Sequence, residues 1–532
     1  MRQSGWAAAL LAAGIAVTGC GGGGSSSGGG SIPPPENAPT VTSTSPLSGA
    51  TGVALNATAT ATFSEAMSAA SITATTFTLT ASNNAQVTGT VSYSAGSTTA
   101  TFTPAASLSA DTTYTAKLST AVLASGGTAL ATAYTWSFTT ASASGGMATV
   151  DFGTTDQTIH GFGGSTAWMP TMPTAQANAL FGTTGSNQLG LSILRVRIDP
   201  GGEANWGAEL GNAQEAQALG ASVIATPWTP PASMKSNSST VGGSLNTGSY
   251  ADYATYLESF VAYMANGGVN LYAISMQNEP DAVVTYESCT WTGAQMDTWV
   301  ANDASVLTTK LMMPESESFV TSLSDPALND ANAVGNIGIV AGHIYGVQPT
   351  YYSNAESKGK EVWMTEHYLS PSGAQPGIAD ALAAAKEIHD SMTVAQYNAY
   401  LWWWMADWNP GTGVTNTGLV DTSNNPTYYG DALAQFAKFI RPGYTRVDAT
   451  ANPTANVYVS AYMGNGHEVM VAINMGSADV SQPFTLENAT VSSMTPYQTS
   501  ATATVAAQAP VTVTGGEFTY TLPAQSITTF VQ

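Results

Sequence analysis

The sequence predicts a multidomain protein, in which an antiparallel β-sandwich precedes a (β/α)8 TIM barrel with an associated side β-sandwich. Residues 38–142 consist of short alternating segments rich in Thr, Ser and Ala, with turn residues at intervals. Helical patterns then alternate with apolar strands over residues 147–440, and residues 441–532 return to alternating strands. Alternation with frequent turns is typical of antiparallel sandwiches, whereas repeated helix-to-strand units indicate a parallel α/β fold.

Residues 1–20, MRQSGWAAALLAAGIAVTGC, are predicted to be a lipoprotein signal peptide. The apolar run is too short to span a bilayer, and its end, VTGC, resembles a bacterial lipobox. We therefore expect an exported chain anchored to a membrane through lipidated Cys20, as a cell-surface or outer-membrane lipoprotein. A plain secretory signal with a chance cysteine is the alternative, and it would leave the protein secreted or periplasmic. Residues 21–37, rich in Gly, Ser and Pro, are predicted to be a linker.

The charge balance excludes nucleic acid as a partner. The chain has 34 Asp and Glu against 12 Lys and Arg, a formal net charge of −22, and so lacks the cationic surface that phosphate backbones require. With only Cys20 and Cys289, the fold does not rest on a disulfide framework. No His, Asp or Glu cluster has the spacing of a metal site, so we expect neither a metal nor a cofactor. We also expect a monomer.

Four segments of residues 38–142 resemble a bacterial Ig-like domain of S-layer type: ATFSEAM at 61–67, TFTP at 101–104, TTYT at 112–115 and YTWSFTT at 134–140. The resemblance covers the whole segment and implies an Ig-like β-sandwich that serves as a spacer or adhesive module. A carbohydrate-binding role would require an exposed row of aromatic side chains, which this segment does not show. We therefore predict a spacer.

The helix-to-strand units that follow predict the barrel. One helix is predicted from i, i+3, i+4, i+7 spacing and ends at two glycines before the strand VNLYAISMQ; its apolar residues are Leu257, Phe260, Val261 and Met264. The order recurs in AQEAQALG followed by ASVIATPW, and in IADALAAAKEIHDSM followed by YNAYLWWWM. Later segments such as NVYVSAYM and HEVMVAIN alternate without a helical pattern. They are assigned to the side β-sandwich, whose first strand comes from about residues 147–160.

Two glutamates are placed where such a barrel builds its active site. Glu279 follows the predicted strand in YAISMQNEPD, and Glu366 ends that in GKEVWMTEHY. Barrel active sites lie at the carboxyl ends of the strands, and a pair of carboxylates is what glycoside hydrolysis requires. Asn278 is placed to hydrogen-bond a sugar 2-hydroxyl. Each glutamate taken alone could equally be a solvated strand-end residue.

Tryptophans also fall at or just beyond predicted strand ends, and the candidates to contact sugar rings are Trp206, Trp228, Trp291 and Trp403. Flat indoles match the apolar C–H faces of sugars. Within the run Trp402–Trp404, alternation directs Trp403 into the pocket and its two neighbours behind the sheet. Packing in the core is the alternative for any single tryptophan.

Seven motifs resemble glycoside hydrolase family 30 and are closest to its bacterial xylanase subfamily 8: HGFGGSTAW, LGLSILRVRID, ATPWTPPASM, NLYAISMQNEPD, GHIYG, EVWMTEHY and KFIRPGY…NVYVSAY. They run in the family's order from about residue 147 to the end. The resemblance implies a (β/α)8 barrel with a side β-sandwich. It also implies an endo-xylanase that cleaves β-1,4-xylan with retention, by a two-glutamate double displacement.

The resemblance implies roles for six residues. Glu279 matches the general acid/base and Glu366 the nucleophile, and retention requires their carboxyl groups to lie about 5–5.5 Å apart. The residues that match the lining of the catalytic subsite are Asn278, Trp228, His343 and Tyr345. His343 could instead be a satisfied core histidine.

The chain departs from subfamily 8 after the WW strand. Subfamily 8 enzymes typically recognise a glucuronate branch there with an arginine, in a stretch similar to Arg-Arg-Ser-Tyr-Gly. This chain has MADWNPGTGVTNTG instead, and no Lys or Arg lies between Lys386 and Lys438. Asp407 would repel a carboxylate. We predict a xylanase that does not depend on glucuronic acid branches and that acts on neutral xylan or arabinoxylan.

Two alternatives stay open. Another family 30 activity, such as a glucuronoxylanase, a β-1,6-glucanase, or an exo-acting xylosidase or glucosidase, would use the same two glutamates. An inactive polysaccharide-binding protein would not need them, and the presence of both carboxylates and Asn278 argues against it.

Overall fold

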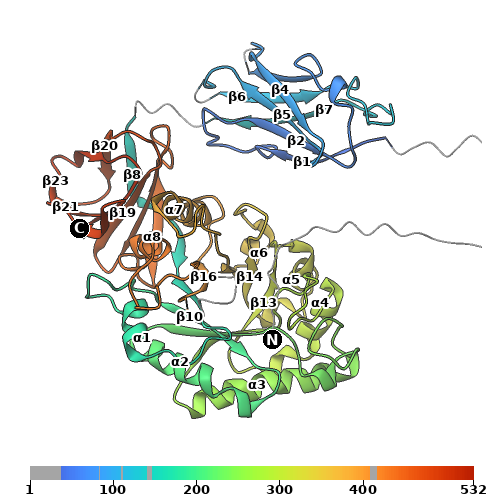
Figure 1. The fold of residues 1–532 in the computed structure, drawn as a ribbon, viewed down its shortest axis with the longest axis vertical. Coiled ribbons are helices and arrows are strands. Elements are labelled where there is room, and N and C mark those ends of the chain that lie inside the picture. The colour runs from blue at the N-terminus through green and yellow to red at the C-terminus, as the bar shows by residue number, and fades with distance from the viewer. Residues whose placement is uncertain (1–37, 83, 110–111, 141–145, 408–415) are drawn as a thin grey trace, which may run out of the picture. The chain divides into compact units, whose positions relative to one another are not determined.

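A computed structural model describes residues 38–82, 84–109, 112–140, 146–407 and 416–532 of the chain (Figure 1). The predicted signal peptide with Cys20, the linker to residue 37, and residues 408–415 lie outside the described residues. The chain divides between Gly145 and Gly146 into two compact units, which are described separately. Within the described part, no helix is both long and apolar enough to cross a membrane.

The amino-terminal unit is a sandwich of two antiparallel sheets. One sheet has the order β1-β2-β5-β4 and the other the order β3-β6-β7. Along β6, Tyr114, Ala116 and Leu118 are buried and the residues between them are exposed, as the alternating segments predict. The strands are β1 (Val41–Ser45), β2 (Ala59–Phe63), β3 (Phe77–Ala81), β4 (Gly89–Ser94), β5 (Thr99–Pro104), β6 (Thr113–Leu118) and β7 (Tyr134–Thr139).

Eight parallel strands of the described chain close into the predicted TIM barrel, in the order β10-β11-β12-β13-β14-β15-β16-β9. The first strand, β9, pairs with both β10 and β16 and so completes the ring. The strands are β9 (Gly161–Ser165), β10 (Ile193–Ile198), β11 (Ser222–Pro227), β12 (Leu271–Ser275), β13 (Lys310–Ser316), β14 (Ile337–His343), β15 (Glu361–Glu366) and β16 (Ala399–Trp404).

In the described residues, an α-helix follows each barrel strand, and the helices cover the outside of the ring (Figure 1). All four residues whose spacing predicts a helix over 257–264 are buried on α3, which confirms that prediction. The chain turns after α3 at Gly268, whose φ of 82° glycine adopts without strain. The helices are α1 (Thr174–Phe181), α2 (Gly207–Ala218), α3 (Tyr250–Asn266), α4 (Gly293–Asn302), α5 (Asp325–Asn329), α6 (Ser353–Ser357), α7 (Ile378–Thr393) and α8 (Tyr428–Ala437).

The inside of the barrel changes from apolar to polar along the strands. An apolar cluster fills the middle of the ring and includes Ile193, Ile224, Ala273, Ala341 and Trp363. Because side chains alternate along a strand, the next inward-facing residues lie two positions further on. They are Arg195, Thr226, Ser275 and His343, and all of them are buried. A polar layer therefore rests on the apolar one, at the carboxyl ends of the strands.

A second sheet, with ten strands in the described residues, lies beside the barrel and includes β8 between β17 and β20. Strands that are far apart in the order of this sheet come into contact. The ring centroids of Phe484 in β20 and Phe530 in β25, for example, lie 5.4 Å apart. The curled sheet encloses its own core, as the predicted side β-sandwich requires. Its strands are β8 (Ala148–Ile159), β17 (Tyr444–Ala449), β18 (Val457–Gly464), β19 (His467–Asn474), β20 (Val480–Glu487), β21 (Ser493–Ser500), β22 (Ala503–Ala507), β23 (Val511–Thr512), β24 (Glu517–Leu522) and β25 (Ser526–Val531).

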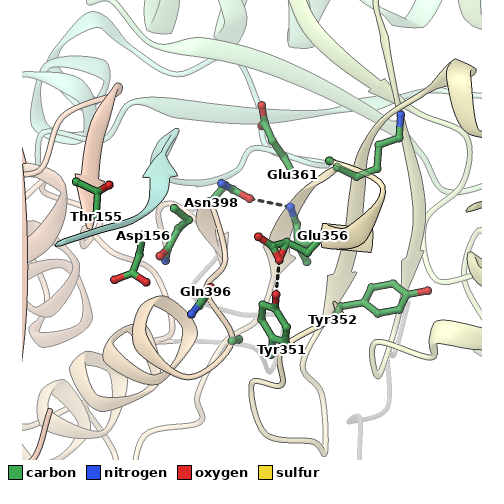
Figure 2. A pocket seen from close by; sticks show the side chains of 13 residues that line it. Thr155, Asp156, Tyr351, Tyr352, Glu356, Glu361, Gln396 and Asn398 are labelled. Carbon is green, nitrogen blue, oxygen red and sulfur yellow. Dashed lines mark hydrogen bonds between the residues drawn. The ribbon is translucent and has the colours of Figure 1, made fainter. Parts of the chain in front are cut away.

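A pocket of about 470 Å³ lies at the amino-terminal ends of β15 and β16, next to β8 (Figure 2). Polar side chains of its lining already have partners in the protein. The Tyr351 hydroxyl donates to Glu356, Asn398 accepts from a backbone amide at 2.8 Å, and Glu361 pairs with His160 at 3.0 Å. This end of a barrel serves stability, and active sites form at the opposite end.

Candidate active site

The structure brings the two predicted carboxylates together at the carboxyl end of the barrel. Glu366 is the last residue of β15, and Glu279 lies just beyond the end of β12. A carboxylate oxygen of Glu279 and one of Glu366 lie within 4.8 Å of each other. Each residue is only 5% exposed. Two buried carboxylates at this distance form a site, and they are not independent solvated residues.

The guanidinium of Arg195, on β10, links the two sides of this site. Its Nη1 donates to Glu366 Oε2 at 2.6 Å, and its Nη2 donates to Asn278 Oδ1 at 2.6 Å. Its Nε donates to Glu315 Oε1 at 3.1 Å. Because Arg195 occupies the oxygen of Asn278, the Nδ2 of that amide is the group that can donate to a sugar hydroxyl.

Glu279 is held by two side chains and by its own backbone. His343 Nδ1 lies 3.0 Å from Glu279 Oε1, and the Tyr286 hydroxyl donates to Oε2 at 3.3 Å. The φ of Glu279 is 42°, and its amide donates to the Glu315 carbonyl at 2.9 Å. A left-handed backbone at a residue other than glycine is strained and persists only where its surroundings hold it. The segment after β12 is therefore built to aim this carboxylate.

Glu366 accepts hydrogen bonds at both carboxylate oxygens. Arg195 donates to Oε2, and the Tyr345 hydroxyl donates to Oε1 at 3.0 Å. Burial raises the pKa of Glu366, and Glu279 adds to this effect, against His343 and Arg195, which lower it. The Glu366 carboxyl therefore retains its proton to a higher pH than the carboxyl of a free glutamate does.

His343, at the end of β14, is fully buried and faces Glu279, Glu315 and Glu366. Burial opposes the charged imidazole, but these carboxylates outweigh it and raise the pKa of His343 to about 9. The side chain is therefore an imidazolium at neutral pH, and its Nδ1 donates to Glu279. This environment is that of a charged site residue and not that of a core histidine.

Three tryptophans form an aromatic wall beside Arg195: Trp168, Trp228 and Trp403. The ring centroids of Trp168 and Trp228 lie 4.9 Å apart, and those of Trp228 and Trp403 lie 5.7 Å apart. The guanidinium carbon of Arg195 lies 4.6 Å from the Trp228 centroid. Trp168 is 36% exposed and Trp403 is partly exposed, so both can offer indole surface to a sugar ring.

Known proteins resemble the barrel and the side sheet together. The "Glucuronoxylanase XynC" of Bacillus subtilis (strain 168) is 38% identical over 395 residues, which cover 72% of this chain and 91% of that protein. The solved structure of the glycoside hydrolase family 30 subfamily 8 xylanase Xyn30A from Clostridium acetobutylicum is 44% identical, with a TM-score of 0.68 over 73% of this chain and 99% of that one. The chain belongs to glycoside hydrolase family 30.

A second solved member of family 30, an endoxylanase from Clostridium papyrosolvens C71, is 44% identical, with a TM-score of 0.66. The match covers 72% of this chain and 99% of that one. Residues 35–140 separately match the family described as a bacterial Ig-like domain, in agreement with the predicted Ig-like sandwich. As a member of family 30, the chain is a glycosidase.

Two tryptophans predicted to contact sugar lie away from the aromatic wall of this family 30 glycosidase. The ring of Trp206 packs against Phe260 of α3 at 5.0 Å, and the ring of Trp291 stacks on Tyr250 at 5.8 Å. Both tryptophans are buried. The loops after their strands turn these side chains into the helix layer, where they stabilise packing.

The run Trp402–Trp404 agrees with its prediction only in part. Trp402 packs behind the sheet, on Tyr429 of α8, with centroids 4.9 Å apart. Trp404 instead stacks on Trp403 at 5.4 Å and is partly exposed. The pairing of β16 with β9 shifts register between Trp402 and Trp404. This irregularity interrupts the alternation on which the prediction relied.

Four residues of the site were not predicted: Trp168, Arg195, Tyr286 and Glu315. Arg195 and Glu315 carry a signal in the sequence, because each places a charge within a mostly apolar strand, in ILRVRI and KLMMPES. A charge on a buried strand requires a partner from another element. Trp168 and Tyr286 lie in loops, and no local pattern distinguishes them from other exposed aromatics.

Spacing alone would also allow a cation at Glu279, His343 and Glu366, whose ligand atoms lie within 4.8 Å of one another. However, these carboxylates already accept hydrogen bonds from His343, Arg195 and Tyr345. A cation would also meet the fixed positive charge of Arg195. The residues present suit an acid–base pair, and a mechanism without a metal stays our prediction.

Proposed function

We propose that this family 30 glycosidase is an endo-xylanase that cleaves β-1,4-xylan with retention. Glu366 attacks the anomeric carbon while Glu279 gives its proton to the departing glycosidic oxygen, and a glycosyl ester of Glu366 forms. Glu279 then takes a proton from water, whose oxygen attacks the same carbon and releases Glu366. The short separation of the two carboxylates, with one oxygen of each within 4.8 Å, carries this proposal, because retaining enzymes hold their carboxyl groups about 5–5.5 Å apart and inverting enzymes hold them further apart.

The buried charges support a single proton on the two reacting carboxyls. Arg195 and His343 bring two positive charges, which ionised Glu315 and one ionised carboxylate of Glu279 and Glu366 balance. When Glu279 carries the remaining proton, the site is neutral. Ionisation of Glu279 as well would add a third buried negative charge that no cation balances. Arg195 and Tyr345 hold the two oxygens of Glu366 in place for attack.

Xylan as the substrate rests on the relatives. The curated relative is named a glucuronoxylanase, and the two solved structures are described as a xylanase and an endoxylanase. The aromatic wall supports a carbohydrate polymer in general, because its partly exposed indoles suit the flat faces of pyranose rings.

We further propose that cleavage does not depend on a glucuronate branch. Arg197 lies under Trp168, but its Nε donates to Glu287 at 2.9 Å and its Nη1 to Asp199 at 2.8 Å. Among the described residues beside the aromatic wall, Arg195 and Arg197 thus both have internal carboxylate partners. The net charge of −22 also opposes an acidic branch.

Glutamine substitutions test the two-glutamate mechanism. Glu366→Gln is expected to abolish hydrolysis of arabinoxylan while xylo-oligosaccharide binding, measured by calorimetry, persists. Glu279→Gln is expected to lower kcat by about 10²–10⁴-fold, as removal of a general acid does. Glu361→Gln, at a carboxylate on the first residue of β15 and so at the opposite end of the barrel, is the matched control. Hydrolysis by Glu366→Gln at the wild-type rate would refute the mechanism.

Product analysis tests the substrate. Arabinoxylan and glucuronoxylan are expected to be cut to similar extents, with β-1,6-glucan as the comparison for other family 30 activities. A product ladder in which every oligomer carries glucuronate at one fixed position would refute independence from the branch.

We also propose that the enzyme acts outside the cell, with the Ig-like unit as a spacer. The match to a bacterial Ig-like domain and the predicted signal and linker support this location. Anchoring through Cys20 predicts that Cys20→Ser moves the enzyme from the membrane fraction to the soluble fraction of cells, and an unchanged distribution would contradict it.

A further inference from the structure

Glu315, near the end of β13, connects the surroundings of both catalytic glutamates. Its Oε1 accepts from Arg195 Nε at 3.1 Å, and its Oε2 accepts from the Thr226 hydroxyl at 2.9 Å. His343 Nε2 lies 3.8 Å from the same Oε1. Its backbone carbonyl accepts from the Glu279 amide at 2.9 Å. One fully buried residue therefore contacts the positive partner of each catalytic carboxylate.

The charge of Glu315 is permanent over the range in which enzymes are assayed. Burial opposes ionisation, but Arg195 and His343 outweigh it and lower the pKa of Glu315 to about 2. Its φ of 52° is left-handed, a conformation that a glutamate keeps only where its surroundings hold it. The protein thus places a fixed negative charge beneath the two carboxylates that react.

The contacts of Glu315 orient two cationic side chains. Arg195 uses Nε on Glu315, so its planar guanidinium directs Nη1 to Glu366 and Nη2 to Asn278. His343 directs Nε2 toward Glu315 and Nδ1 to Glu279. Displacement of Glu315 would therefore misalign the partners of the nucleophile and of the acid together.

We propose that Glu315 is a positioning residue of the reaction, whose fixed charge keeps His343 protonated toward Glu279 and aims Arg195 at Glu366. This inference rests on the proposed function, in which Glu279 is the acid and Glu366 the nucleophile. The groups that face His343 are Glu279, Glu315 and Glu366, with Glu317 and the ring of Tyr345 further out. Loss of one of these carboxylates makes the imidazole release its proton at lower pH.

Two substitutions separate the charge of Glu315 from its shape. Glu315→Gln removes the charge and is expected to lower kcat about 10²-fold. In the pH profile of kcat/KM, the alkaline limb is expected to move down by about one pH unit or more. Glu315→Asp keeps the charge but draws it away from Arg195, so kcat falls less and the limb stays in place. Glu361→Gln is the matched control, because Glu361 also pairs with a histidine, His160 at 3.0 Å, but lies at the opposite end of the barrel.

NMR titration of the His343 imidazole gives a readout that needs no substrate. Its midpoint is expected to fall by about one unit or more in Glu315→Gln and to stay at the wild-type value in Glu361→Gln. A wild-type midpoint, or a wild-type kcat and alkaline limb, in Glu315→Gln would overturn the inference. If Glu315→Gln does not fold, a wild-type kcat in Glu315→Asp overturns it equally.

These readouts also separate the inference from the proposed function. Full hydrolysis by Glu279→Gln and Glu366→Gln would remove the proposed function, and with it the roles assigned to both neighbours of Glu315. A fall in the His343 midpoint in Glu315→Gln would still support control of the imidazole by Glu315. If Glu279→Gln and Glu366→Gln both lose hydrolysis but the His343 midpoint is unchanged in Glu315→Gln, the role of Glu315 is overturned and the proposed function stands.

Discussion

At the scale of single residues, the site depends on charges held inside the barrel. Arg195, Glu315 and His343 are fully buried, and each is paired with an opposite charge from another segment of the barrel. Breaking a buried ion pair by removing one partner is costly, because the remaining charge stays buried without compensation. Substitutions at these positions are therefore expected to affect both catalysis and stability.

The raised pKa of His343 predicts how stability depends on pH. Its pKa of about 9 lies above the ordinary value of 6.5, so folding favours the protonated form. This stabilisation, about 3 kcal/mol at most, is fully present below about pH 6.5 and is lost as the pH rises through about 9. Urea unfolding of the wild type and of His343→Gln, measured below pH 6.5 and above about pH 9, should show a difference in the free energy of unfolding that becomes smaller as the pH rises. Parallel curves would contradict the assignment.

At the scale of elements, the loop after each strand determines whether a tryptophan lines the aromatic wall or packs against the helices. Trp228 directly follows β11 and Trp403 lies in β16, so both stay beside the polar layer of the barrel. Trp206 caps the start of α2 and Trp291 precedes α4, and both turn into the helix layer. All four tryptophans lie at or near strand ends in the sequence, yet only the first two join the aromatic wall.

A pair of alanine substitutions tests this distinction. Trp206→Ala is expected to lower the free energy of unfolding by about 3–5 kcal/mol and to leave KM for xylan unchanged, because the indole is a packing residue. Trp403→Ala is expected to raise KM with a smaller loss of stability, because its ring is partly exposed. Urea unfolding and steady-state kinetics measure both quantities. A higher KM in Trp206→Ala, with wild-type stability, would place that residue at the substrate.

At the scale of the whole molecule, the two units differ in how far they depend on other parts of the chain. The Ig-like unit has a hydrophobic core of its own. The side sheet, in contrast, shares buried contacts with the barrel: Gln435 of α8 donates to Thr499 at 2.8 Å and accepts from Thr529 at 2.7 Å. The Ig-like unit can therefore fold alone. The side sheet encloses a core on one face but buries its other face against the barrel, so these two parts support each other.

Truncation tests this division. Removal of residues 1–145 is expected to leave the Tm of the barrel and its kcat on soluble xylo-oligosaccharides at wild-type values. Removal of residues 441–532 is expected to yield insoluble protein, because it uncovers buried residues of α8. Calorimetry and activity of the two truncated chains provide the measurements. A soluble and active barrel without residues 441–532 would show that the side sheet is dispensable.

Much of the fold could be predicted because its signals are local. Period-2 and period-3.6 patterns, with glycines between them, indicate the sandwich, the barrel helices and the side sheet. Glu279 and Glu366 could be proposed as a pair because parallel strands of a barrel all end at one face. The prediction for Trp404 failed where a register shift breaks the same local alternation.

By itself, the sequence determined the fold class and the two carboxylates, since both follow from short-range periodicity and from position at strand ends. Only the tertiary structure decided the partners of those carboxylates. Arg195 is separated by 171 residues from Glu366 and by 120 from Glu315, and no local pattern specifies which distant charges meet. Ring closure sets those neighbours, because it fixes the order and register of all eight strands at once.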